Sequence, residues 1–171
     1  MNLDILKIAS DTNNNKSIKN YTHHSKLKNS MCGDEMQIDL VIKKNKIVDF
    51  GYQGKSCVYC QASASLLSKI SMNENKSKIN ELCDDAKHYF EGNVENIEKK
   101  WKSLNKIFND KNLSRKECIL LPFKTVKKIV KASIKFKIPI VTFYVFSTEN
   151  WKRPKTEVNF LFNLIKSYFN S

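Results

Sequence analysis

The sequence predicts an α+β fold, a small antiparallel sheet packed with helices, followed by an incomplete α/β strand–loop–helix fragment. Residues 36–42 and 47–52 alternate between apolar and polar side chains, which is the period of half-buried strands. Apolar stripes at helical spacing flank these two runs along the chain. The apolar run Ile138–Phe146 is different, because it is typical of a strand buried on both faces of a parallel sheet.

The first half of the chain is expected to contain a short helix, a polar segment and a β-hairpin. Residues 3–9 have enough apolar side chains for a short helix. Residues 10–29 are polar and rich in Asn, Lys and Ser, which predicts a mobile connector. His23 and His24 lie inside it without a nearby Cys or acid, so we expect solvated loop residues rather than metal ligands. The polar turn at residues 43–46 joins the two strands into a hairpin.

Helices dominate the sequence that follows the hairpin. From Cys57 onward, small residues favour a helix that packs tightly against the sheet. Residues 76–108 predict two helices split at Gly92, and residues 109–114 predict a connector. A further helix is expected after Cys118. The second helix of the pair would place four residues on one face: Ile97, Trp101, Leu104 and Phe108.

The last forty residues change in character. The buried strand Ile138–Phe146 is followed by a loop at residues 147–154 and an amphipathic helix at residues 156–169. One strand cannot form a sheet alone. We therefore divide the chain into residues 1–125, a complete small domain, and residues 126–171, a truncated fragment of another fold.

Composition limits the function classes. The chain has 171 residues, 41% hydrophobic, and a net charge of +13. Its cations are nearly all Lys, with Arg only at positions 115 and 153, so the charge reflects a Lys bias rather than a phosphate-binding surface, and no nucleic-acid partner is expected. Five cysteines without a secretory signal, and no stretch long enough to span a bilayer, indicate a cytoplasmic protein.

Four residues form the expected site: Cys32, Asp34, Cys57 and Cys118. Three thiolates and a carboxylate suit a tetrahedral zinc site or an iron–sulfur cluster. The Asp is a harder, weaker ligand, which suits a carrier that releases its cargo. Because Cys57 precedes a helix and follows Lys55, we expect the helix dipole and this cation to favour its thiolate.

Each cysteine has an alternative interpretation as a small buried apolar residue. For Cys83, in a helical stripe with Leu82 and Ala86, that interpretation is preferred. Cys60 forms a C-x-x-C pair with Cys57, which is typical of redox-active or zinc-binding pairs, so it is kept as a spare ligand or auxiliary thiol.

Four segments carry a family resemblance: Cys32-Gly33-Asp34-Glu35, Gly54-Lys55-Ser56-Cys57, Ala62-Ser63-Ala64-Ser65 and Arg115-Lys116-Glu117-Cys118. They resemble the U-type iron–sulfur cluster scaffold family (SufU, IscU and the NifU N-terminal domain) over residues 1–125. The resemblance implies that the three cysteines and Asp34 bind zinc or a [2Fe–2S] cluster. It also implies a cysteine desulfurase partner, with Cys118 as the persulfide acceptor. Such a protein is a scaffold or sulfur carrier more than an enzyme.

The chain departs from the scaffold family beside its third cysteine. The family usually has His or Lys before that cysteine, and here Glu117 occupies the position. A carboxylate would repel an incoming persulfide or serve as a ligand itself.

The C-terminal part resembles a second family. Residues 146–154, which include Asn150, Trp151 and Arg153, are similar to a motif of cis-prenyltransferases, the undecaprenyl diphosphate synthases. In that family the segment helps to place isopentenyl diphosphate, and Mg²⁺ binds the diphosphate. The catalytic Asp-Gly-Asn-Gly-Arg motif and the late arginines are missing here, so catalysis is not expected. The alternatives are an inactive prenyltransferase relative or a gene fusion without a selected function.

Overall fold

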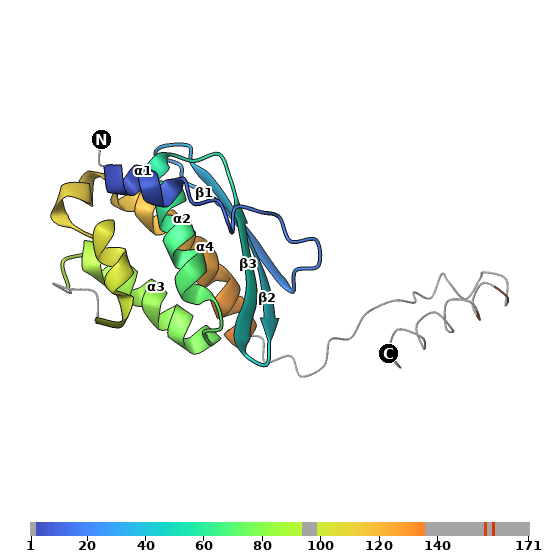
Figure 1. Ribbon diagram of the computed structural model, residues 1–171. Coiled ribbons are helices and arrows are strands. Elements are labelled where there is room, and N and C mark those ends of the chain that lie inside the picture. Colours follow the sequence, from blue (N-terminus) through green and yellow to red (C-terminus); the bar gives the residue numbers. More distant parts are fainter. Residues whose placement is uncertain (1–2, 94–98, 136–155, 157–158, 160–171) are drawn as a thin grey trace. The chain divides into compact units, whose positions relative to one another are not determined.

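The structure is a computed structural model that describes residues 3–93, 99–135, 156 and 159. The chain divides into two compact units, residues 1–136 and 137–171. In the first unit, three antiparallel strands form one sheet in the order β1-β2-β3: β1 His23–Lys28, β2 Glu35–Lys43 and β3 Lys46–Gln53. Helices pack on this sheet, so the predicted α+β fold is confirmed (Figure 1).

The hairpin between β2 and β3 closes through a two-residue turn. Lys44 and Asn45 both have positive φ, 45° and 66°. This pairing of left-handed residues matches the turn that follows the right-handed twist of antiparallel strands. The alternating pattern of β2 then points Met36, Ile38 and Leu40 to the inner face, where each is at most 1% exposed.

The helices form layers against the inner face of the sheet. Helix α2 (Val58–Ser71) packs on β3, and α4 (Lys116–Lys135) packs on β1 and β2. Helix α1 (Leu3–Ala9) contacts α2, and α3 (Lys76–Phe90) lies against α4 on the side away from the sheet (Figure 1).

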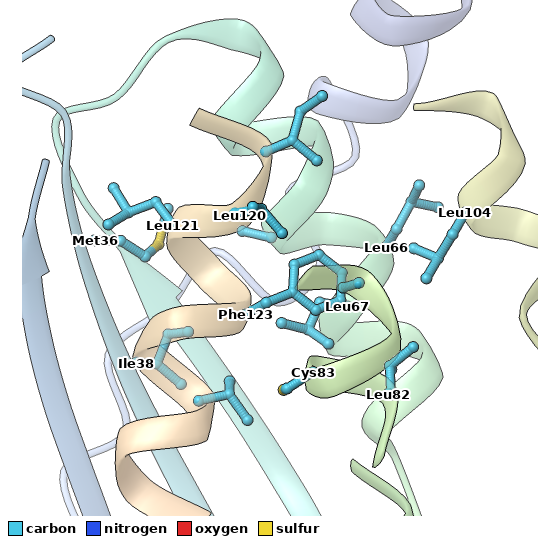
Figure 2. Packing of buried hydrophobic residues seen from close by; sticks show 14 of the residues in the cluster. Met36, Ile38, Leu66, Leu67, Leu82, Cys83, Leu104, Leu120, Leu121 and Phe123 are labelled. Atoms are coloured by element: carbon cyan, nitrogen blue, oxygen red, sulfur yellow. The ribbon is translucent and has the colours of Figure 1, made fainter. Parts of the chain in front are cut away.

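The core lies between these helices and the sheet. Figure 2 shows Phe123 of α4 among side chains from α2 and α3, including Leu67 and Cys83. Met36 of β2 lies beside Leu121 on the sheet side of α4. This packing fixes α2 and α4 to each other and to β2, the three elements from which the site is built.

The strand β1 corrects the prediction of a mobile connector at residues 10–29. Its sequence is polar, but it pairs with β2 along its length, with His24 opposite Asp39. His24 Nδ1 lies 2.7 Å from Asp39 Oδ1, and the Ile18 N–H donates to Asp39 Oδ2 at 3.1 Å. The two histidines are therefore strand residues, and the segment before them is anchored to the sheet through Ile18 and to α2 through Asn14, which donates to the Ser68 hydroxyl at 3.0 Å.

The segment after α3 also differs from the prediction. The chain does turn after α3, but it continues as two 3-10 helices, η1 (Lys99–Lys106) and η2 (Asp110–Arg115), instead of an α-helix and a connector. Trp101 breaks η1 with φ −110° and ψ 26°, while its side chain is only 2% exposed. Leu104 and Phe108 are buried as predicted.

Several predictions fall outside the described residues. These are the inward position of Ile97, the buried strand at 138–146, and the residues Asn150, Trp151 and Arg153. Helix α4 continues through residue 125, and the domain boundary placed there stays a prediction. Among the described helices, none combines the length and apolarity needed to cross a membrane.

Candidate functional site

A tight loop between β1 and β2 presents Cys32 and Asp34. The Asn29 N–H donates to the Asp34 carbonyl at 2.8 Å, and the Gly33 N–H donates back to the Asn29 carbonyl at 2.9 Å. Gly33 has a φ of +77°, a conformation that costs a side-chain-bearing residue free energy. The loop therefore leaves Cys32 exposed at its tip and turns the Asp34 side chain inward.

A close backbone approach brings the next ligand beside Asp34. After β3, the chain runs along the start of β2, where the Glu35 N–H donates to the Lys55 carbonyl at 2.8 Å. A Cβ on Gly54 would lie 2.0 Å from the Glu35 carbonyl oxygen, so only glycine fits this crossing. As a result the Cys57 N–H reaches Asp34 Oδ1 at 3.1 Å.

The third cysteine comes from the first turn of α4. Cys118 is buried, and its sulfur lies 3.8 Å from the exposed Cys32 sulfur. One hydrogen bond fixes α4 against α2 next to Cys118, because the Ser63 hydroxyl donates to the carbonyl of the following residue, Ile119, at 2.6 Å. The ligand atoms of Cys32, Asp34 and Cys118 all lie within 4.8 Å of one another, which makes a metal-binding group within the described part of the chain.

The donor atoms fit a tetrahedral metal. With Zn–S bonds of about 2.3 Å, two thiolates on one tetrahedral zinc lie about 3.8 Å apart, and the Cys32 and Cys118 sulfurs have that separation. Asp34 is 8% exposed, and its Oδ2 is buried without a hydrogen-bond partner among the described residues. Since a buried, unpaired carboxylate oxygen is costly, a bound cation would satisfy it.

Burial favours the protonated form of two of the predicted ligands, Cys57 and Cys118. Burial, the largest effect, raises the pKa of Cys57, and the neighbouring Asp34 carboxylate adds to the increase. The backbone N–H of Cys60, at the start of α2, lowers the pKa of Cys57 as expected of a helix N-terminus, but burial outweighs it. Burial and hydrogen bonding with Cys57 likewise raise the pKa of Cys118. Because a metal ion deprotonates its cysteine ligands, metal binding here would release protons.

Cys83 and Cys60 are not among the four predicted metal ligands. Cys83 is 3% exposed in the core, as predicted, and burial raises its pKa to about 12. Cys60 is fully buried on α2, and burial raises its pKa to about 12 as well. Neither belongs to the metal-binding group of described residues, which also does not include the predicted ligand Cys57. Cys60 differs from Cys83 in lying near Cys57 and Cys32, whose charges affect its pKa.

Glu117 lies beside the site without joining the metal-binding group. Its Oε2 accepts a hydrogen bond of 2.6 Å from Lys124 Nζ, two turns further along α4. Glu117 and Lys124 line a cavity of about 190 Å³ with Lys28 and Asn29 of the neighbouring loop. The cation compensates the carboxylate that departs from the scaffold pattern.

Two supporting residues were not identified from the sequence. Asn29 holds the Cys32 loop, and Ser63 links α2 to the start of α4. The small-residue pattern around Ser63 indicated close packing, but the hydrogen-bond partner depends on two helices that are distant in the sequence. Nothing in the sequence around Asn29 indicated its role.

Family models match two parts of the chain. The model of the NifU-like N-terminal domain matches residues 4–87. The prenyltransferase model, described as undecaprenyl diphosphate synthase, matches residues 105–171. The two matches agree with the two resemblances stated above, and the second one begins before α4.

The relatives divide in the same way. The isoprenyl transferase of Shouchella clausii is 58% identical over 48 residues, which are 28% of this chain and 19% of that protein. The chain thus spans about a fifth of the length of such transferases. The iron–sulfur cluster assembly scaffold protein IscU of Thermotoga maritima is 33% identical over 106 residues, which are 61% of this chain and 73% of that protein.

A solved structure shares the fold of the first unit. The N-terminal NifU-like protein of Brucella abortus superposes with a TM-score of 0.72 at 17% identity, covering 79% of this chain and 94% of that chain. The C-terminal residues are similar to isoprenyl transferases. Through its N-terminal unit, the chain belongs to the NifU/IscU-like family of iron–sulfur cluster assembly scaffold proteins.

Proposed function

We propose that residues 1–125 act as a scaffold for iron–sulfur cluster assembly, with Cys32, Asp34, Cys57 and Cys118 as the ligands. The single observation that carries this proposal is the convergence of the Cys32, Asp34 and Cys118 ligand atoms within 4.8 Å. The cluster would be cargo, built on the thiolates and passed on. Either zinc or a [2Fe–2S] cluster fits three thiolates and one carboxylate.

Sulfur would come from a cysteine desulfurase, with Cys118 as the residue that accepts it as a persulfide. Cys118 is buried but lies next to the exposed Cys32, so the loop at residues 29–34 is the route by which a donor would reach it. The exposed position of Cys32 suits a first contact with the donor. Such chemistry requires reduced thiols, so we expect the protein to act in a reducing compartment such as the cytoplasm.

The metal content of the purified protein tests this function. The full chain, purified without air, should hold about one zinc or iron–sulfur cluster per chain, as four protein ligands imply. Cys32→Ala and Asp34→Ala should hold it less tightly and retain less of it after dialysis against a chelator, while Cys83→Ser, a core cysteine outside the group, should retain as much as wild type. Equal metal content in wild type and Cys32→Ala would contradict the proposal.

The transferase similarity does not lead us to propose prenyl transfer. The matched segment corresponds to about a fifth of those enzymes. Incorporation of labelled isopentenyl diphosphate into a polyprenyl product by the full chain, with added Mg²⁺, would overturn this view.

A further inference from the structure

Cys57, one of the four proposed ligands, is paired in the sequence with Cys60, which is not a ligand. Cys57 is the N-cap residue of α2, with extended φ and ψ of −68° and 164°. Cys60 lies three residues later, in the first turn. Residues three apart on a helix are neighbours, which is close enough for a disulfide without moving the backbone far.

The first thiol of the pair is more exposed than the second, as in redox-active C-x-x-C pairs. Cys57 is half-buried, whereas Cys60 is 0% exposed. In a C-x-x-C pair at a helix N-terminus, the first cysteine meets the outside partner and the second, shielded one resolves the resulting disulfide. Cys57 is linked to the group that contains Cys118, because its backbone N–H donates to Asp34 Oδ1 at 3.1 Å and the ligand atoms of Asp34 and Cys118 lie within 4.8 Å of each other. Cys57 is thus the cysteine that connects this group to the buried Cys60 of the same helix turn.

We propose that Cys57 and Cys60 act as a built-in dithiol that reduces the persulfide on Cys118 and releases its outer sulfur as sulfide. This activity rests on the proposed sulfur acceptance at Cys118. It goes beyond that function because it supplies, from this chain, the two electrons that turn sulfane sulfur into the sulfide of a cluster.

The reaction has two exchange steps. The Cys57 thiol attacks the inner sulfur of the Cys118 persulfide, which forms a Cys57–Cys118 disulfide and expels the outer sulfur as hydrosulfide. The Cys60 thiol then attacks the Cys57 sulfur, which forms a Cys57–Cys60 disulfide and returns Cys118 as a thiol. Two thiols are oxidised to one disulfide, and the sulfane sulfur takes up the two electrons and leaves with two protons as hydrogen sulfide.

The test uses the full, metal-free chain loaded with sulfur by glutathione persulfide, with the donor then removed by desalting. Mass spectrometry first measures the gain of one sulfur atom on Cys118. Sulfide release and the disulfide formed are then followed without added reductant. Wild type should release about one sulfide per persulfide and yield a Cys57–Cys60 disulfide.

Matched variants separate this inference from the function beneath it. Cys60→Ser and Cys60→Ala should load sulfur as wild type does but release sulfide at least about tenfold more slowly or stop at the Cys57–Cys118 disulfide. Cys83→Ser, which removes an equally buried cysteine, should behave as wild type. Two results would overturn the inference alone. One is normal sulfur loading followed by sulfide release at the wild-type rate in both Cys60 variants, and the other is a wild-type product without the Cys57–Cys60 disulfide. Failure of wild type to load sulfur at Cys118 would overturn the proposed function and the inference together.

Discussion

The Asp34 carboxylate accepts a hydrogen bond of 3.1 Å from the backbone N–H of Cys57, and this contact joins the two halves of the site. One carboxylate oxygen is used to position the cysteine. The other is buried without a partner among the described residues, and is left to a metal ion. The contact depends on how closely β2 and the segment after β3 approach each other.

Gly54→Ala should disrupt that approach. Its Cβ would lie 2.0 Å from the Glu35 carbonyl oxygen, so the backbone must move, at a cost of about 1–3 kcal/mol in free energy of unfolding. Metal affinity should fall as well, because Asp34 and Cys57 would separate. Urea unfolding and zinc titration measure both effects. Gly92→Ala, a strained position after α3, serves as control: it should cost about 1 kcal/mol through its φ of +77° but leave zinc affinity unchanged.

Ser63→Ala should loosen α4 from α2. The substitution removes the buried hydrogen bond from the Ser63 hydroxyl to the Ile119 carbonyl, which costs about 0.5–1.5 kcal/mol of unfolding free energy. Ser10→Ala, which removes an exposed hydrogen bond to Lys7, should change stability by less than about 0.5 kcal/mol. Equal losses in these two variants would show that the α2–α4 link does not stabilise the site.

These residues also show how far the sequence could predict the structure. The strands β2 and β3 were predicted because their alternation records which face is buried, and Cys32, Asp34, Cys57 and Cys118 were predicted because donor type and flanking motif are local. The strand β1 was not, because its residues, His23–Lys28, are nearly all polar and it is stabilised by pairing with β2. Partners such as Ser63 and the Ile119 carbonyl meet only after the helices pack.

The His23 side chain should make stability depend on pH. Burial, and to a lesser degree Lys76, lowers its pKa in the folded protein from 6.5. The unfolded chain therefore binds the proton more tightly, so this contribution to stability is complete above pH 6.5 and decreases as pH falls toward the lowered folded value. His23→Gln should flatten the decrease between pH 7 and about pH 5. In an NMR titration, Lys76→Ala should raise the His23 midpoint, and an unchanged midpoint would contradict the assignment.

The Lys124 cation should protect sulfur transfer from the Glu117 carboxylate. Lys124→Ala leaves that charge uncompensated next to Cys118, so an anionic persulfide donor should load sulfur about two- to fivefold more slowly, as suits an exposed ion pair. Glu117→Gln added to Lys124→Ala should restore the rate. Added salt should reduce the difference between the single variant and wild type. A double variant as slow as the single one would rule out a charge effect.

The most direct test of the four-ligand site is X-ray absorption at the metal edge of the zinc-loaded full chain. The proposed four-ligand site predicts three sulfur ligands at about 2.3 Å and one oxygen at about 2.0 Å, from the three cysteines and Asp34. Asp34→Ala should lose the protein oxygen and keep three sulfurs, and Cys32→Ala should keep two. A spectrum with fewer than three sulfurs in wild type, or one unchanged by either substitution, would contradict a metal site built from Cys32, Asp34, Cys57 and Cys118.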